Sequence, residues 1–261
     1  MDKQVGAVDA DGNDAPDRVA VEEPLQIVVD GHPLAITMRT PGADEELALG
    51  FLLTEGVIRS VDEIRKIDVE SRENHALVFL HDDVEVDYGR LTRHVFRASS
   101  CGICGRATID AVTSGQVPLT SEIRFPKDVL LGSPDLLTAA QTTFARTGGL
   151  HGVGIFDADG RCLVVREDVG RHNAVDKALG HALRSGNDLA SCFLLVSGRV
   201  SFEIMQKALV GGVPLVAAIS APSSLAIEFA QRSNQTLVGF LRPPSFRVYA
   251  GAERISGLVG C

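Results

Sequence analysis

The chain has 261 residues with 25 Lys and Arg against 34 Asp and Glu, so its formal net charge at pH 7 is −9. This length can bury a sizeable core in one large domain or two small ones, and the acidic, 45% hydrophobic composition excludes a disordered protein and disfavours general nucleic-acid binding. The five cysteines are odd in number, which argues against a secreted disulfide framework and favours the reducing cytoplasm.

The N-terminal residues 1–18 contain five Asp, one Lys and one Arg but few large apolar side chains, the reverse of a signal peptide. We interpret them as a disordered leader. Further along, the twenty residues between Lys207 and Glu228 carry no charge, yet glycine, proline and serine interrupt them. This stretch is better interpreted as the buried core of an α/β protein, and no membrane-spanning segment is expected.

Residues 19–89 are expected to form a small α+β unit. Apolar and polar residues alternate over 25–38 around Asp30-Gly31, a pattern typical of a β-hairpin. A helix is predicted next, because three consecutive acidic residues precede an apolar stripe and Gly56 suits its C-terminal end. Two more strands are predicted over residues 64–88.

Residues 128–250 are expected to form a second, larger domain. A helix over 128–146 precedes an antiparallel hairpin of residues 152–156 and 162–165. Three rounds of helix and strand follow, with helices over 173–183, 201–210 and 224–231 and strands over 193–196, 215–219 and 236–241. This order predicts an α/β fold, a three-layer αβα domain with a mixed sheet that has one antiparallel edge. Residues 251–261 are interpreted as a C-terminal tail.

The loops that follow the predicted strands are candidates for a phosphate site, because ligands of such folds bind beyond the carboxyl ends of the strands. Glycine and serine before a helix leave backbone N–H groups available for phosphate, and arginine adds charge. The candidates in these loops are Arg171, His172, Ser197, Arg199 and Ser220. His151 begins a strand beside these loops, and it is either a structural residue or part of the lining of the ligand pocket. No Walker A or G-x-G-x-x-G motif indicates an NTPase or a dinucleotide dehydrogenase.

Cys101 and Cys104 form a C-x-x-C pair within residues 90–127, which we interpret as a mobile cysteine loop and connector. Such spacing can lower the pKa of one thiol and supply a nucleophilic thiolate. The stretch between Asp87 and Asp110 holds four Arg and no acidic residue, so it is +4 while the remainder of the chain is −13. Redox or sulfur chemistry is favoured, with half of a zinc site, or two thiols without function, as alternatives. A zinc site would need a second close Cys/His pair. The other cysteines are isolated at Cys162, Cys192 and Cys261, so no metal is expected.

Several longer motifs, in a defined order along the chain, are more specific than the cysteine pair alone. They are Cys101–Gly105, Thr147–His151, Arg166–Lys177, Ser197–Ser201, Ser220–Ser224 and Thr236–Arg242. With them, the chain from about Val19 to Ala250 resembles the FdhD family of formate dehydrogenase accessory sulfurtransferases. The resemblance implies a cytidine-deaminase-like fold for the larger domain. The H-x-E and P-C-x-x-C signatures of zinc deaminases are missing, which disfavours deamination.

The resemblance also implies a reaction. A sulfur atom would pass from a cysteine desulfurase, through a persulfide on Cys101, to the bis-molybdopterin guanine dinucleotide cofactor that formate dehydrogenase needs. Cys104 would be the second thiol, and the nucleotide would lie over the strand-end loops. The cofactor-binding stretch of the family maps to Phe240, Leu241, Arg242, Pro243, Pro244 and Ser245.

Two other functions stay open from the sequence. One is a chaperone that binds the guanylated cofactor without catalysis, and the other is a dithiol-disulfide oxidoreductase, although the C-x-x-C pair lacks the setting of thioredoxin. A homodimer is the default expectation for this architecture.

Overall fold

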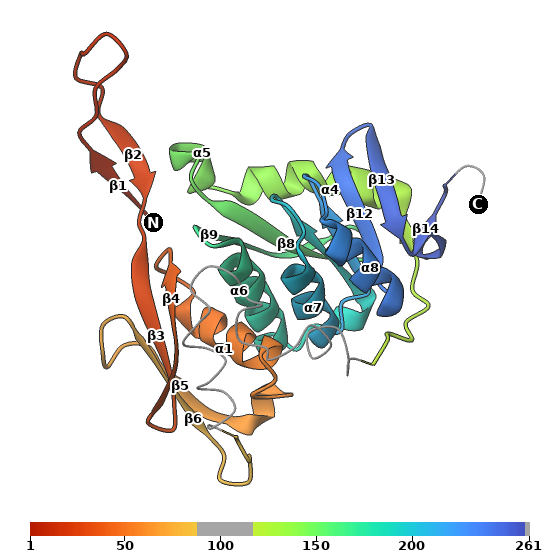
Figure 1. Cartoon of the computed structure of the whole chain (residues 1–261), viewed down its shortest axis with the longest axis horizontal. Helices are drawn as coiled ribbons and strands as arrows, with labels where there is room; N and C mark the ends of the chain where they lie inside the picture. The colour runs from red at the N-terminus through yellow and green to blue at the C-terminus, as the bar shows by residue number, and fades with distance from the viewer. Residues whose placement is uncertain (88–116, 259–261) are drawn as a thin grey trace.

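The computed structural model of the chain describes residues 1–87 and 117–258 (Figure 1). Within these residues the larger sheet has six strands in the order β13-β12-β11-β10-β8-β9. The strands are β8 (His151–Asp157), β9 (Cys162–Asp168), β10 (Cys192–Val196), β11 (Leu215–Ala218), β12 (Thr236–Arg242) and β13 (Ser245–Ala250). Strands β10, β11 and β12 are parallel, β8 is antiparallel to both β9 and β10, and β13 is antiparallel to β12. The sheet is therefore mixed, as predicted, but antiparallel strands lie at both of its edges, whereas the sequence predicted one antiparallel edge.

Helices cover both faces of this sheet. One face packs on α6 (Arg171–Arg184), α7 (Phe202–Val210) and α8 (Ser224–Arg232), and the other packs on α4 (Lys127–Ala140). Each face of the sheet forms a hydrophobic core with its helices. All residues of β10 are apolar and buried, and successive side chains point alternately into the two cores, so both faces need a covering layer. Leu194 and Val196 face α6 and α7, whereas Phe193 and Leu195 face α4. The expected α/β class and three-layer arrangement are confirmed.

The N-terminal unit is a four-stranded sheet in the order β4-β3-β6-β5, with one helix on its inner face. Its elements are β3 (Glu23–Val29), β4 (His32–Arg39), α1 (Asp44–Thr54), the 3₁₀ turn η1 (Val61–Glu63), β5 (Ile64–Asp68) and β6 (His75–Leu80). Asp30 and Gly31 both have positive φ, as a type I′ hairpin requires. Gly56 has φ 71° just after α1, in the conformation typical of a helix end. The predicted hairpin and helix are confirmed.

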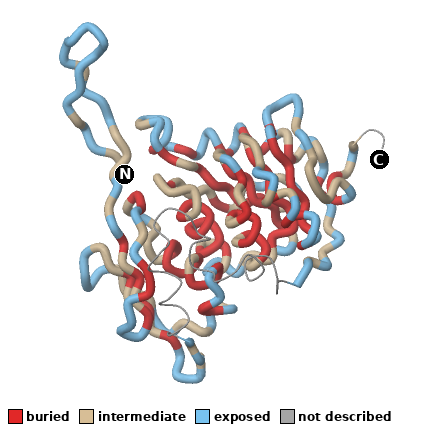
Figure 2. The backbone as a smooth tube through the Cα atoms, viewed as in Figure 1, coloured by how far each residue is buried: buried red, intermediate tan, exposed pale blue. Residues whose placement is uncertain are grey.

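The two units meet through α1 and α6, whose backbones are in direct contact. A Cβ atom built on Gly180 of α6 would lie 2.0 Å from the carbonyl oxygen of Glu46, so only glycine allows this approach. Leu183 and Val210, at the ends of α6 and α7, pack against the core of the N-terminal unit. Figure 2 shows the buried backbone continuing from α1 through α6 into the large sheet.

The structure differs from the sequence prediction at the N-terminus. Residues expected to be a disordered leader form a hairpin of β1 (Asp2–Val5) and β2 (Asp17–Ala20), which projects from the body and is exposed along most of its length (Figures 1 and 2). The carboxylate of Asp2 accepts hydrogen bonds from Arg18 of the same hairpin and, at 3.0 Å, from Arg146. This long-range ion pair fixes the base of the hairpin.

Two further differences lie in the larger domain. The helix predicted over 128–146 ends at Ala140 and is followed by the short α5 (Phe144–Thr147), whose first N–H groups are bound by the carboxylate of Glu167. The second is that β13 and β14 (Ile255–Ser256) were not predicted. Strand β14 pairs in parallel with β7 (Phe125–Pro126) and Ile255 is buried, so part of the expected C-terminal tail belongs to the fold. The remaining 3₁₀ turns are η2 (Leu189–Ser191) and η3 (Ala252–Arg254).

The uncharged stretch before Glu228 belongs to α7, β11 and the start of α8. Among the described residues, no helix has both the length and the apolar character that crossing a membrane requires.

Candidate functional site

The candidate site lies at one edge of the large sheet, where the predicted loops meet. Strands β10, β11 and β12 all end at this edge, and antiparallel β8 begins there, with Val153 opposite Val196. Two of the loops are bonded to each other, since Val200 N–H donates to the carbonyl of Ala221 at 3.2 Å and Ser223 N–H donates to that of Val200 at 2.9 Å. The convergence of loops expected from the strand order is thus present.

Three helices start at the same edge. Their N-cap residues are Gly170 for α6, Ser201 for α7 and Ser223 for α8. Ser223 accepts a side-chain hydrogen bond from Ala226 N–H, whereas no described side chain caps α6 or α7. The first backbone N–H groups of a helix have no partner inside the helix and carry a partial positive charge. This edge of the sheet therefore suits an anion.

His151 and His172 lie near the two arginines of these loops. Burial lowers the pKa of His151, and the positive charges of Arg171 and Arg199 lower it further. The pKa of His172 is lowered to about 4 by burial, then by nearby cations led by Lys207. Both imidazoles are consequently neutral hydrogen-bonding groups at pH 7, and the described cations that act on them are Arg171, Arg199 and Lys207.

The surroundings of His172 are polar and close. Its Nε2 lies 3.4 Å from Ser201 Oγ and 3.9 Å from a carboxylate oxygen of Glu203. Glu203 raises the pKa of His172 but does not offset the effects of burial and of the cations. In a neutral imidazole one ring nitrogen donates a hydrogen bond and the other accepts one, so the role of His172 Nε2 depends on the tautomer.

Ser197 joins His151 to the edge of the sheet. The Ser197 hydroxyl accepts from Gly152 N–H at 2.9 Å, and Ser197 N–H donates to the Gly152 carbonyl at 2.9 Å. The next residue, Gly198, leaves room for the histidine ring, because a Cβ there would lie 3.2 Å from His151 Nδ1. The structure thus brings Ser197 and His151 together.

The stretch from Phe240 to Ser245 completes the edge, with one exception. Phe240 N–H donates to the Ser220 carbonyl at 3.0 Å, which joins this stretch to the predicted loop at Ser220. Phe240 has a left-handed backbone with φ 52°, and the guanidinium of Arg247 lies 5.1 Å from its ring centroid. Leu241, in contrast, is fully buried in the core beneath α4, so its side chain does not reach the exposed edge.

The other members of this stretch are on the surface. Arg242 is exposed, and its Nε donates to the Ile219 carbonyl at 3.1 Å. Pro243 and Pro244 are also exposed and form the turn between β12 and β13, and the exposed Ser245 begins β13.

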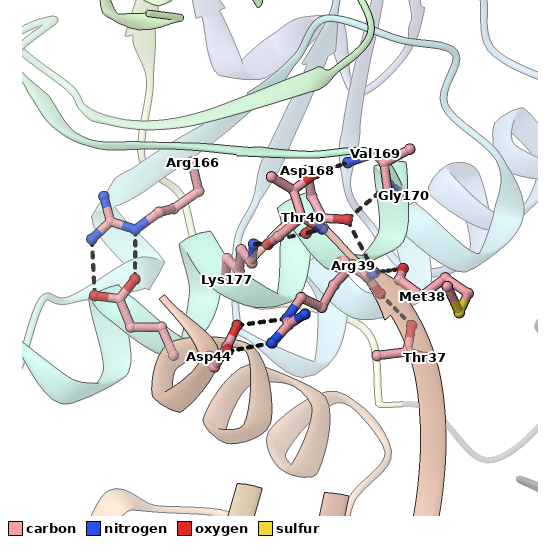
Figure 3. A network of polar contacts seen from close by, with 12 residues as sticks. Thr37, Met38, Arg39, Thr40, Asp44, Arg166, Asp168, Val169, Gly170 and Lys177 are labelled. Atoms are coloured by element: carbon pink, nitrogen blue, oxygen red, sulfur yellow. Dashed lines mark hydrogen bonds and ion pairs between the residues drawn. The ribbon is translucent and has the colours of Figure 1, made fainter. Parts of the chain in front are cut away.

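Much of the motif Arg166–Lys177 serves a different purpose from phosphate binding. Arg166 pairs with Glu46 of α1, with Nη2 2.8 Å from Oε1, and Lys177 pairs with Asp168 at 2.7 Å (Figure 3). The Arg166–Glu46 pair joins β9 to α1, and Lys177 Nζ also donates to the Thr40 carbonyl at 2.7 Å, so both cations hold the N-terminal unit against the larger domain. This role was not predicted, and the structure shows it through the charged residues Asp176 and Lys177, which lie inside the continuously buried run 173–180.

The predicted cysteine pair, Cys101 and Cys104, lies outside the described residues, as does the arginine-rich stretch around it. The two described cysteines are free thiols, and neither suits nucleophilic chemistry. Burial raises the pKa of Cys162, and burial raises the pKa of Cys192 to about 11. Within the described ranges, no group of His, Cys, Asp and Glu is arranged to hold a metal ion.

Comparisons with known proteins show which family the chain belongs to. The family model described as the FdhD/NarQ family matches residues 20–256. The sulfur carrier protein FdhD of Streptomyces avermitilis is 48% identical over 253 residues, which cover 92% of this chain and 90% of the relative. The protein of the same name from Mycobacterium tuberculosis is 47% identical, with 92% of each chain covered. The crystal structure of a candidate formate dehydrogenase accessory protein from Desulfotalea psychrophila covers 98% of both chains with a TM-score of 0.79 and 26% identity. The chain therefore belongs to the FdhD/NarQ family.

Proposed function

We propose that this protein is a sulfur carrier for the maturation of formate dehydrogenase. It would accept sulfur from a cysteine desulfurase as a persulfide on Cys101 and present that sulfur to the bis-molybdopterin guanine dinucleotide cofactor. The observation that carries the proposal is the sheet edge where Arg171, Arg199 and two uncapped helix starts converge. Membership of a family whose relatives are named sulfur carrier proteins supports it.

The first step is a thiol exchange in which the Cys101 thiolate attacks the outer sulfur of the donor persulfide. A new S–S bond forms at Cys101 while the S–S bond in the donor breaks, and the donor cysteine leaves as a thiolate. Electrons and atoms balance without another reactant. The cationic stretch around Cys101 in the sequence favours the thiolate that this attack needs, and Cys104 provides a second thiol nearby in the chain.

The cofactor is the substrate of this reaction, and its pyrophosphates match the charge of the sheet edge. Arg171, Arg199 and Arg242 would pair with phosphate oxygens, and the first N–H groups of α6 and α7 would donate to them. The exposed ring of Phe240 offers a flat surface for the guanine base. Neutral His151 and His172 would add hydrogen bonds without further charge.

Mass spectrometry tests the sulfur-carrier function. After incubation with a cysteine desulfurase and cysteine, the peptide containing Cys101 should gain roughly 32 Da, one sulfur atom, and lose it on reduction. The variant Cys101→Ala should not support formate dehydrogenase activity, whereas Cys192→Ala should, because that thiol is buried and protonated. If Cys101→Ala matures the dehydrogenase normally, the protein is a cofactor-binding chaperone instead.

The proposal includes a setting for the reaction. A persulfide relay needs reduced thiols, so we place the protein in the cytoplasm, where the desulfurase and the unfinished dehydrogenase would be its partners. We propose a homodimer as its working state. Light scattering of the purified protein would measure the mass, and a monomer at micromolar concentration would contradict the dimer.

A further inference from the structure

A buried polar network surrounds Asp168, just before the start of α6. Asp168 is fully buried, and Lys177 Nζ lies 2.7 Å from its Oδ2 (Figure 3). The same ammonium group donates to the Thr40 carbonyl at 2.7 Å, and Thr40 N–H donates to Asp168 Oδ2 at 3.1 Å. Thr40 follows directly after β4, so the network joins the N-terminal unit to the larger domain.

The network also fixes the turn that leads into α6. Gly170 N–H donates to Asp168 Oδ1 at 2.8 Å, and Val169 N–H donates to the Thr40 hydroxyl at 3.2 Å. Two successive backbone groups of this turn are therefore held by a carboxylate and a hydroxyl that are themselves buried. Arg171 is the next residue along the chain.

Asn173, which follows Arg171 and His172 in the chain, also fixes the first turn of α6. Its Nδ2 donates to the Met38 carbonyl at 2.7 Å and to Asp168 Oδ1 at 3.1 Å. Its Oδ1 accepts from the Thr37 hydroxyl at 3.0 Å. Every polar atom of the Asn173 side chain is thus used to hold the helix start against β4.

We propose that Thr40, Asp168 and Lys177 are positioning residues, which set Arg171 and His172 in place for ligand binding. The N-terminal unit would then contribute to the site without touching the ligand. The inference rests on the proposed function, because it assumes that this helix start binds an anionic cofactor.

The hydrogen bonds around Asp168 lie at the turn before Arg171, a position that stabilising the contact between the two units does not require. An ion pair elsewhere between the two units would also join them, as Arg166 of β9 and Glu46 of α1 do. The network around Asp168 instead satisfies backbone N–H groups one and two residues before Arg171. Misplacing a binding group by a small distance costs much of its contribution, so loss of one of these bonds is expected to weaken binding.

The sharpest test removes one hydroxyl group. Thr40→Val keeps the shape of the side chain and removes the acceptor of Val169 N–H, whereas Thr40→Ser keeps that acceptor. Thr236→Val is a matched control, because Thr236 is also buried and its hydroxyl donates to the Gly251 carbonyl at 2.8 Å, at the start of β12 rather than its end. Arg166→Met is a second control, which weakens contact between the two units away from the turn.

Guanosine diphosphate is the probe, with its affinity measured by calorimetry. We expect Thr40→Val to bind about tenfold more weakly than the wild type, a typical effect of one lost hydrogen bond in a positioned site. Thr40→Ser and the two controls should bind as the wild type does. Equal affinity of Thr40→Val and the wild type would overturn the inference, and so would an equal loss in Arg166→Met.

The titration of His172, followed by NMR without ligand, is a readout that a merely structural role would not change. The groups that act on His172 are Lys207, Glu203, Arg171 and His151. If the turn relaxes, Thr40→Val should raise the His172 midpoint, while Thr236→Val should not. A wild type that binds no guanosine diphosphate would disprove the proposed function alone. The titration would then decide the inference, and an unchanged midpoint in Thr40→Val would reject it.

Discussion

The backbones of Gly50 in α1 and Asp176 in α6 are in contact, since a Cβ atom on Gly50 would lie 1.8 Å from the Asp176 carbonyl oxygen. The same helices meet again at Gly180, and polar side chains also join them, since the Thr54 hydroxyl donates to Asp176 and Arg184 pairs with Glu46, each at 2.9 Å. Because both partners at Gly50 are backbone atoms in regular helices, neither can move away without separating the helices.

The first prediction is that Gly50→Ala lowers the free energy of unfolding by about 3 kcal/mol, the upper range for overpacking a tight contact. Gly132→Ala in α4 is the matched control, because no atom lies within 4 Å of a Cβ there. This control should raise stability by about 0.4–1 kcal/mol, as alanine restricts the unfolded chain. Urea denaturation followed by circular dichroism measures both, and equal stabilities would contradict the packing.

The second prediction concerns the buried pair of Asp176 and Lys207. Lys207 Nζ lies 2.9 Å from both carboxylate oxygens of Asp176, and the Thr54 hydroxyl lies 2.9 Å from the same carboxylate. Burial raises the pKa of Asp176, and the charge and hydrogen bond of Lys207 act in the opposite direction, so removing Lys207 leaves a buried carboxylate without its cation. Lys207→Met should therefore lower the free energy of unfolding by about 3–5 kcal/mol.

The exposed pair Arg65–Asp82, 3.9 Å apart, provides the comparison for that experiment. Arg65→Met should change the stability by less than about 0.5 kcal/mol, because water screens the pair. The double variant Asp176→Asn with Lys207→Met removes both charges and should recover part of the loss. If Lys207→Met and Arg65→Met have similar effects in urea denaturation, the buried pair contributes no more than the exposed one.

Local sequence predicted the regular elements well and the long-range contacts poorly. The segment Asp157-Ala-Asp-Gly160 was recognised as a hairpin turn because apolar strands flank it, and the Asp157 carboxylate accepts from the N–H groups of Asp159 and Arg161. The identical tetrapeptide Asp9-Ala-Asp-Gly12 makes the same kind of turn, with Asp9 accepting from two N–H groups. This first hairpin was not predicted, because its strands are polar and show no apolar alternation. It is held in place by Arg146, which lies far along the chain.

In the candidate site, too, features set by the order of elements were predicted, whereas features set by long-range contacts were not. Periodicity gave the order of helices and strands along the chain. That order predicted the convergence of the loops that hold Arg171, Ser197, Arg199 and Ser220. The role of Asp168 and Lys177 could not be predicted, because their partner Thr40 lies in another unit and its contact depends on how the units dock. The burial of Leu241 was also missed, since an irregularity in the pairing of β12 with β13 changes which side chains face outward.

The third prediction is that stability falls as the pH drops from about 6.5 to about 4. The pKa of His172 is about 4 in the folded protein because the ring is buried near Lys207, whereas an unfolded histidine titrates near 6.5. Between these values the unfolded chain binds a proton that the folded chain does not, so acid favours unfolding. The loss should be on the order of 3 kcal/mol.

The variant His172→Gln tests the source of this pH dependence, because glutamine can replace the contact with Ser201 but does not titrate. Its stability should fall less than that of the wild type between pH 7 and pH 4.5, as measured by urea denaturation at each pH. Parallel curves for the two proteins would assign the pH dependence to other groups.

The fourth prediction concerns the charge at the sheet edge. Arg199 is exposed, and its positive charge helps to lower the pKa of His151, so it lies close to the candidate site. Arg199→Ala should weaken the binding of guanosine diphosphate about tenfold, the effect of losing one charge-assisted hydrogen bond. Binding should also become less sensitive to salt, because fewer charge pairs remain for ions to screen.

Arg161→Ala is the control for general charge effects. Arg161 is also exposed, but it lies in the turn between β8 and β9, at the opposite end of those strands from His151. It changes the net charge by the same amount, so a ligand attracted only by overall charge would lose affinity equally in both variants. A loss confined to Arg199→Ala, measured by calorimetry at two salt concentrations, would place the phosphates at the strand ends. An equal loss in Arg161→Ala would remove that edge from consideration as the binding site.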